Sequence, residues 1–270
     1  MKTFRWKLTA LALVVHALSQ QAAQAGTVRD DIDYLLYRNF AENRGPFRPG
    51  ATDIEVQFKD GSLAGVLNKA PMPDWSGLVT AGFAQLINPQ YIATANHNKG
   101  FRAVSFGYNN NYRELIDNHE YSYRKVAHNY TEQVDSKGNV YGGDFATPRL
   151  DKLVTEATPI AMSPLPWASF NDRSRFPVFY RAGAGTQNIQ SADGTKVNLT
   201  GAYTWTTGGT ITTAQLYSYY NWFLGSGTQG QLFTDVHLPL PIAVEPGDSG
   251  SPLIAWDNVD KRWVFIGELY

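Results

Sequence analysis

Ser249 lies in the short stretch Gly247-Asp248-Ser249-Gly250-Ser251-Pro252, whose residue types suit a nucleophile. A serine hydroxyl is a poor nucleophile at neutral pH, so it needs a nearby base and donors for the oxyanion that develops. Glycines on both sides allow a tight turn that aims backbone N–H groups into a cleft. We expect the N–H groups of Gly247 and Ser249 to be these donors. The stretch alone is also compatible with an ordinary turn between two strands.

Histidine is the usual base for such a serine, and beyond the first 25 residues the sequence has four: His97, His119, His128 and His237. His97 is the strongest candidate, because it follows the apolar run at 91–95 and opens a polar loop. Without Ser249 it would be interpreted as a structural histidine at a strand end. His119 and His128 lie among charged and polar residues and are interpreted as surface. His237 lies in an apolar stretch and is interpreted as core or cleft wall.

The base also needs a carboxylate on its far ring nitrogen to hold the correct tautomer. Asp144 is the predicted partner, since two glycines precede it and Phe145 follows it. Its competitors are an aspartate in a turn and two in charged stretches: Asp135, Asp117 and Asp151. The resulting chain order, histidine then aspartate then serine, is that of proteases with two β-barrels and differs from that of α/β-hydrolases and subtilisins.

Composition excludes several classes of function. The chain has 270 residues, of which 43% are hydrophobic and 17% charged, enough for one large or two small domains. The net charge of −1 gives no indication of a nucleic-acid or anionic-membrane partner. Cysteine is absent, which excludes disulfides, a thiolate nucleophile and cysteine-ligated metals. No metal, nucleotide or haem motif is present, so we expect no cofactor.

The first 25 residues have the features of a signal peptide. Three basic residues precede a largely apolar run at 8–18, and Ala23-Gln24-Ala25 forms a cleavage site of small residues. The apolar run is too short to span a bilayer. We therefore expect cleavage before Gly26 and export through the periplasm to the cell surface or the medium.

Short strands separated by turn residues dominate the remainder. One amphipathic helix is expected at 28–43, and hairpins are expected at 54–67 and 83–95. Further strands are expected at 102–108, 120–130, around 140, and at 178–181, 196–205, 210–217, 252–256 and 263–270. Glycine-rich turns are expected at 182–185, 206–209 and 225–230. Regularly spaced short strands favour a sandwich or barrels.

Together with the order of the site residues, this pattern predicts an all-β, chymotrypsin-like double β-barrel. The first barrel would comprise residues 26–155 and carry His97 and Asp144. The second would comprise residues 156–270 and carry Ser249, with residues 153–161 connecting the two.

Several blocks of sequence then resemble a known family. The blocks lie in order at 37–43 (YRNFAEN), 48–51, 88–92, 148–156 (PRLDKLVTE), 183–187, 247–252 and 263–264. The chain resembles the protease domain of the immunoglobulin A protease-like autotransporters over residues 28–270. In that family the residues matching His97, Asp144 and Ser249 form the catalytic triad.

The resemblance implies a secreted serine endopeptidase that cleaves host extracellular proteins. It also implies a long passenger exported through an outer-membrane barrel that this chain does not contain. The sequence ends at Tyr270, about where the wall of the primary specificity pocket should begin, so we expect an incomplete second barrel. Ala243 roughly matches the floor of that pocket and argues against a preference for Lys or Arg. The partner of Asp248 is open, with Arg29 as one suggestion.

The sequence leaves two rival functions open. The first is a non-catalytic adhesin or binding module built on a protease fold, which a complete set of triad residues disfavours. The second is a periplasmic quality-control protease, which the family blocks disfavour.

Overall fold

Strands are the main secondary structure of the described residues, and the all-β prediction is confirmed. The computed structural model describes residues 24–107, 121–134, 137–138, 140–184, 186–199, 206–211, 217–219, 223–225, 232–233, 238–245 and 247–269. In chain order the strands are β1 (Gln24–Arg29), β2 (Ile54–Gln57), β3 (Leu63–Leu67), β4 (Ala84–Asn88), β5 (Tyr91–Ala95), β6 (Ala103–Val104), β7 (Tyr123–Ala127), β8 (Tyr130–Val134), β9 (Val140–Ala146), β10 (Arg149–Leu150), β11 (Phe179–Ala184), β12 (Thr186–Gln190), β13 (Lys196–Leu199), β14 (Thr206–Thr210), β15 (Tyr217–Tyr219), β16 (Phe223–Gly225), β17 (Ile242–Ala243), β18 (Pro252–Asp257) and β19 (Arg262–Glu268). The helices are α1 (Tyr34–Ala41) and the short 3-10 helices η1 (Gly45–Phe47), η2 (Trp75–Gly77), η3 (Asn96–Asn98) and η4 (Trp167–Asn171).

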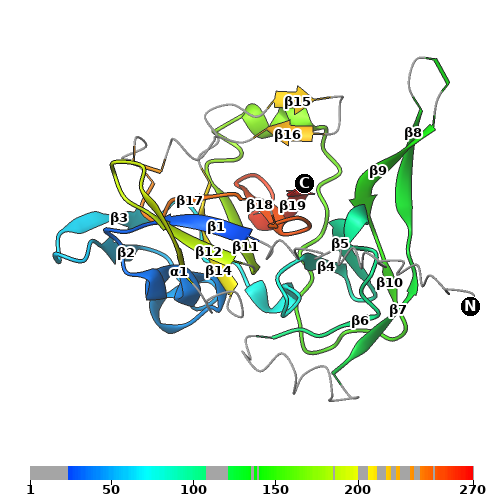
Figure 1. Ribbon diagram of the computed structural model, residues 1–270, viewed down its shortest axis with the longest axis horizontal. Helices are drawn as coiled ribbons and strands as arrows, with labels where there is room; N and C mark the ends of the chain where they lie inside the picture. Colours follow the sequence, from blue (N-terminus) through cyan, green and yellow to red (C-terminus); the bar gives the residue numbers. More distant parts are fainter. Residues whose placement is uncertain are drawn as a thin grey trace, which may run out of the picture.

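One curled sheet brings together β5, which leads into the 3-10 helix that carries His97, and β9, which carries Asp144. Its order is β6-β7-β10-β5-β9-β8, with β4 pairing with β5 as the predicted hairpin requires. Its core is a separate cluster of apolar side chains that includes Leu86, Ile92 and Leu150. Pairing of Ala95 in β5 with Phe145 in β9 sets the end of β5 beside the Asp144 backbone. This sheet lies on the right of Figure 1, where the β8–β9 hairpin extends away from the body.

Eight of the other described strands form two four-stranded sheets, whereas β2 pairs only with β3 and β15 only with β16, and the larger core lies among them. One has the order β14-β11-β18-β19, and the other has the order β13-β12-β1-β17. Figure 1 shows β18 and β19, in red, between the group of strands on its left and the sheet of β4 and β5 on its right. The predicted hairpin of β2 and β3 is present, and the strands predicted at 252–256 and 263–270 pair with each other as β18 and β19.

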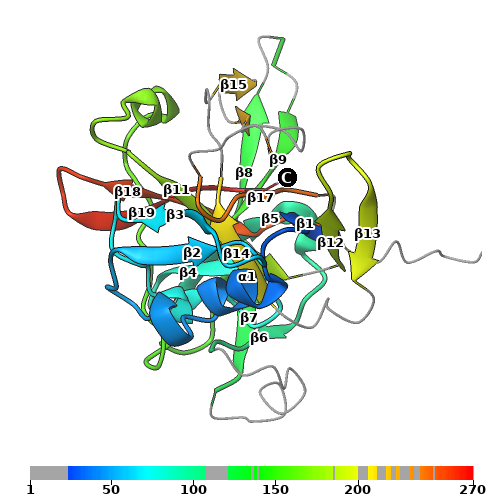
Figure 2. The same cartoon turned by 90° about the vertical axis from the view of Figure 1, so that its left-hand side faces the viewer.

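The amino-terminal helix is shorter than predicted. Residues 28–29, assigned to the helix from the sequence, belong to β1, which pairs in parallel with β12 and antiparallel with β17. The helix α1 begins only after Asp33, whose side chain accepts a hydrogen bond from the N–H of Leu35. It packs on β14, as Figure 2 shows from the side of α1.

Two glycine-rich segments predicted as turns are strands instead. Ala184 ends β11, and residues 206–210 form β14. A Cβ on Gly208 would come within 2.7 Å of the Arg181 carbonyl oxygen, and one on Gly209 within 2.4 Å of the Leu240 oxygen. Glycine is required at these positions because other backbone approaches closely, not because the chain turns.

Close backbone contacts join the two groups of strands. A Cβ on Gly82 would come within 2.1 Å of the Ala184 nitrogen, and one on Gly250 within 2.2 Å of the Phe83 oxygen. The residues between β10 and η4 contain no other helix or named strand, as expected for a connection. The domain boundary near residue 155 stays a prediction. Within the described residues, no helix has the length and hydropathy needed to cross a bilayer.

Candidate active site

His97 is held by two hydrogen bonds to Asp144. Nδ1 of the ring lies 2.7 Å from Oδ2 of Asp144, and the backbone N–H of His97 donates to Oδ1 at 2.9 Å. The histidine side chain is 49% exposed, whereas that of Asp144 is 15% exposed. A carboxylate on Nδ1 favours a proton on that nitrogen and leaves Nε2 as the acceptor. The pair therefore presents a basic nitrogen at the surface of the molecule.

The element after β5 positions both members of this pair. Asn96 begins η3, and its side-chain amide donates to the Gly143 carbonyl oxygen at 3.1 Å, next to Asp144. His128 contacts the Asn96 Oδ1 with its Nε2 at 2.8 Å. His128 is thus half-buried beside the site rather than the plain surface residue that the sequence suggested. Burial, with the charges of Lys125 and Lys99, lowers the pKa of His128.

Ser249 lies beside this pair because Asn98 holds its backbone. The Asn98 amide donates to the Ser249 carbonyl oxygen at 2.8 Å. The next residue, Gly250, packs on the first sheet so closely that only glycine fits. No hydrogen bond joins the Ser249 hydroxyl to His97 in the part of the chain described. Such bonds are often long in a free enzyme and tighten when substrate binds.

The backbone around Ser249 leaves two N–H groups without a protein acceptor. The N–H groups of Asp248, Gly250 and Ser251 donate to carbonyl oxygens. Among the described residues, those of Gly247 and Ser249 have no such partner. Gly247 has a φ of 102°, a value that glycine adopts without strain. These are the two N–H groups that the sequence named as donors to an oxyanion, and this role stays a prediction.

Asp248 is completely enclosed by three donors. Arg181 Nη2 lies 2.6 Å from Oδ1, and the backbone N–H groups of Gly26 and Glu245 donate to Oδ2 at 2.9 and 3.0 Å. The side chains of Arg181 and Asp248 are 0% and 1% exposed. Burial raises the pKa of Asp248 to about 6, although Arg181 opposes this shift. The suggestion of Arg29 as the partner was wrong, because Arg29 pairs with Asp31.

The remaining candidates lie elsewhere. Ala243 is buried in β17 opposite Thr27 of β1, and its place in a specificity pocket stays a prediction. Asp151 binds Arg124 at the surface. Two histidines and two aspartates considered for the base and its carboxylate lie outside the described residues, as does most of the signal peptide: His119, His237, Asp117, Asp135 and residues 1–23.

Three residues of the site carried no sequence signal. Two of them, Asn98 and Arg181, contact a partner far away in the chain, and the third is Glu268, a partly buried acid of β19. Asn98 reaches Ser249 across 151 residues, and Arg181 reaches Asp248 across 67. No local pattern reports such contacts.

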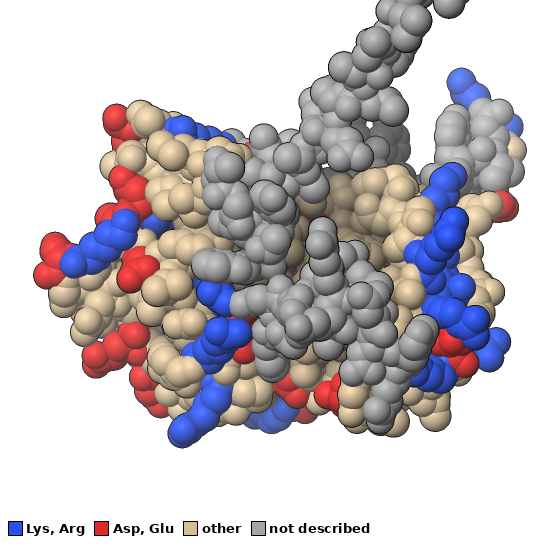
Figure 3. Space-filling view, turned by 60° about the horizontal axis from the view of Figure 1, so that its bottom comes forward, with Lys and Arg blue, Asp and Glu red and all other residues tan. Residues whose placement is uncertain are grey.

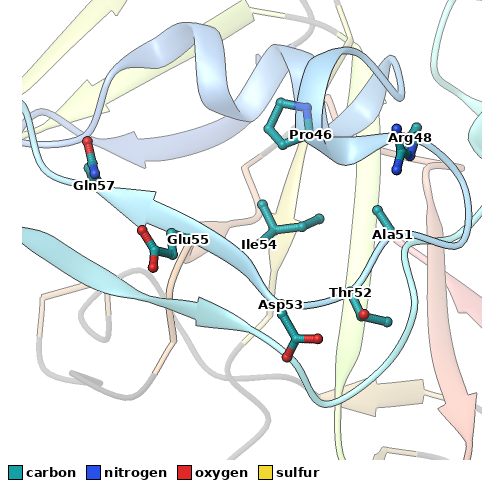
Figure 4. Close-up of a pocket in the computed structure, with 8 residues that line it drawn as sticks. All are labelled: Pro46, Arg48, Ala51, Thr52, Asp53, Ile54, Glu55 and Gln57. Atoms are coloured by element: carbon teal, nitrogen blue, oxygen red, sulfur yellow. The ribbon is translucent and has the colours of Figure 1, made fainter.

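Charge and shape are uneven over the surface. Lys and Arg side chains gather on the right of the face in Figure 3, the side that carries β6, β7 and β10 in Figure 1. Exposed cations of this part of the chain are Lys99, Arg102, Arg124 and Arg149. A pocket of about 560 Å³ lies between η1 and β2 (Figure 4). Its lining, at 46–57, includes none of the site residues.

Known proteins resemble this chain in sequence. A family model described as Immunoglobulin A1 protease matches residues 25–270. The serine protease EatA of Escherichia coli O78:H11 is 38% identical over 270 residues, covering 96% of this chain and 18% of EatA. The SepA autotransporter of Shigella flexneri is 38% identical over 258 residues, covering 92% of this chain and 17% of SepA. The chain thus spans less than a fifth of the length of these relatives.

A solved structure resembles the chain as a whole. The Hap adhesin of Haemophilus influenzae aligns with a TM-score of 0.79 and 36% sequence identity, covering 90% of this chain and 26% of the Hap chain.

Proposed function

Because the chain belongs to the immunoglobulin A1 protease family, we propose that it is a serine endopeptidase that uses His97, Asp144 and Ser249. The observation that carries this proposal is the doubly bonded His97–Asp144 pair beside Ser249, together with the N–H groups of Gly247 and Ser249, which have no acceptor within the described residues. A binding surface has no need for this combination. An acyl-transfer enzyme needs all of it.

In the proposed reaction, His97 Nε2 takes the proton of the Ser249 hydroxyl as the oxygen attacks the carbonyl carbon of a peptide bond. Asp144 holds the ring and stabilises the imidazolium that forms. The N–H groups of Gly247 and Ser249 donate to the oxyanion. The amine leaves with the proton from His97, and water then releases the acyl group from Ser249 with His97 again acting as base.

Substrate and location follow from the relatives. EatA and SepA are named as serine proteases, SepA as an autotransporter. We therefore assign to this chain protein substrates outside the cell, export by the signal peptide at 1–25, and a place in an autotransporter passenger. Ala243 is the proposed floor of the primary specificity pocket. Peptides with a small or apolar residue before the cleaved bond should then be preferred over those with Lys or Arg.

The test is labelling of the exported chain by a fluorophosphonate probe that reacts with activated serines. Ser249→Ala should lose all labelling and all turnover while the circular dichroism spectrum stays the same. Ser62→Ala is the control, since this exposed serine lies in the turn after β2 and its hydroxyl donates to Asp60. Equal labelling of both variants would refute the assignment of Ser249.

The similarity to the Hap adhesin favours one alternative, a surface binding module. In that case the folded chain would not react with the probe but would bind to a cell or matrix surface. Ser249→Ala would then bind as well as the original chain, and the two functions are thereby separated.

A further inference from the structure

Glu268 is a buried acid that the proposed reaction does not use. It ends β19. This strand follows β18, which itself follows residues 247–251, the nucleophile segment that contains Ser249. The side chain is partly buried, and its Oε2 atom is shielded from water without a hydrogen-bond partner among the described residues. An ionised carboxylate in such a place is unfavourable unless other groups compensate for it.

A β-bulge determines where Glu268 points. In the pairing of β18 with β19, Ile254 lies opposite Phe265, whereas Leu253 lies opposite Gly267 and Pro252 opposite Glu268. Residues opposite each other share a face of the sheet, and so do residues two apart on one strand. Phe265 and Glu268 therefore share a face only because Ile266 is an extra residue. Without it, Glu268 would point to the other side.

This face of β19 lies against the segment that carries Asp144. The rings of Phe265 and Phe145 have their centres 6.3 Å apart, and Phe145 follows Asp144 directly. The end of β19 is also tied to the nucleophile segment, because Gly250 N–H donates to the Leu269 oxygen at 2.7 Å. Burial, and after it the negative charge of Asp144, raises the pKa of Glu268 to about 9. The two carboxyl groups are thus electrostatically coupled.

The hydrogen bonding of the two acids differs. Asp144 receives hydrogen bonds from the ring and the backbone of His97. Glu268 receives none within the described residues and keeps its proton.

Among the described residues, the neighbouring elements supply no other uncompensated charge to Glu268. Asp257 lies at the far end of β18 and binds Arg175. Asp248, directly before Ser249, binds Arg181. The titratable Tyr91 lies at the start of β5, away from Ala95 and η3. When two carboxyl groups share a site, one is held neutral in this way.

We infer that Glu268 is a positioning residue for the His97–Asp144 pair. While neutral, it leaves Asp144 as the single negative charge beside His97 and offers a proton to that carboxylate. When it ionises, it repels Asp144 and weakens the hold on the imidazole. The role depends on the proposed function, because only there does Asp144 orient a base.

The first measurement is the pH dependence of kcat/KM for the exported chain with a peptide substrate. Activity of the original chain should fall as pH rises through about 9. Glu268→Gln stays neutral at every pH, so it should remove this alkaline fall. Glu268→Leu should also remove it but lower kcat at all pH values, because it cannot donate to Asp144. Glu55→Gln, at an exposed site on β2, is the control and should keep the original profile.

Two further readouts do not require activity. The low-field NMR signal of the His97 Nδ1 proton should shift with pH near 9 in the original chain and not in Glu268→Gln. The folded pKa of Glu268 is raised, so its contribution to stability is present below pH 4.5 and is lost as pH rises toward 9. The melting temperature of Glu268→Gln relative to the original chain should therefore increase between pH 5 and 9.

Superimposable profiles and an unchanged NMR titration in Glu268→Gln would overturn the role of Glu268. A different result would separate the two proposals. If the original chain were inactive but its His97 signal still titrated only when Glu268 is present, the proposed function would be contradicted and the coupling of Glu268 to the pair would be retained.

Discussion

At the scale of single residues, the ion pair of Arg181 and Asp248 holds the backbone next to Ser249 in place. Both side chains are fully buried, and Asp248 directly precedes Ser249. Removing one partner of a buried pair leaves an uncompensated charge, which typically costs about 3–5 kcal/mol. Arg181→Met should therefore lower the free energy of unfolding by about that amount, measured by urea denaturation, and should also weaken probe labelling of Ser249.

The matched control is Arg124→Met. Arg124 also binds an aspartate, Asp151, but its side chain is 78% exposed. Pairs at the surface contribute about 0–1 kcal/mol, so this variant should differ little from the original chain. If Arg181→Met were equally harmless, the buried pair would have no structural role.

The sequence allowed prediction of the residues proposed to do chemistry but not of the residues that contact them. His97, Asp144 and Ser249 stand out by type, by their apolar and glycine neighbours and by their order. Arg181 and Glu268 look like ordinary strand residues. Their positions become informative only in the folded chain. Arg181 contacts Asp248 across 67 residues, and a bulge of one residue in β19 determines where Glu268 points.

At the scale of elements, Gly250 limits how closely the nucleophile segment approaches the first sheet. Its φ is 85°, and a Cβ there would come within 2.2 Å of the Phe83 oxygen and 2.6 Å of Thr94 Oγ1. Gly250→Ala should therefore displace Ser249 from His97 and reduce the rate of probe labelling by at least roughly tenfold, as small misplacements of reacting groups do.

Gly61→Ala separates this effect from backbone strain. Gly61 has the same φ of 85°, but a Cβ there would meet nothing within 4 Å. It should cost about 1 kcal/mol of stability and leave labelling unchanged. Equal loss of labelling in both variants would contradict a role for the close approach at Gly250.

Prediction of secondary structure failed where glycine occurs in a strand rather than in a turn. The hairpins at β2–β3 and β4–β5 follow alternation and turn residues, which are local signals. The glycines of β14 have the same composition as a turn, yet they lie in a strand, where the Arg181 and Leu240 backbone packs against them. Only the tertiary neighbours distinguish the two cases.

At the scale of the whole molecule, β1 joins the amino end of the chain to its last third. Val28 in β1 is fully buried and lies opposite Ile189 of β12 and Ile242 of β17. Val28→Ala should lower the free energy of unfolding by about 2 kcal/mol. Val197→Ala, on β13 of the same sheet and 58% exposed, should change it by less than about 0.5 kcal/mol. Chemical denaturation of both variants checks this difference.

The bond from Gly26 to Asp248 spans 222 residues, and it sets an order of events during synthesis. β1 leaves the ribosome first but has no partner until β12 and β17 have been made. A contact across so many residues is slow to close. The turn that displays Ser249 therefore gains its full set of buried donors only when almost all of this sequence is available. A half-translated chain would lack the bond from Gly26 to Asp248, and with it the finished turn at Ser249.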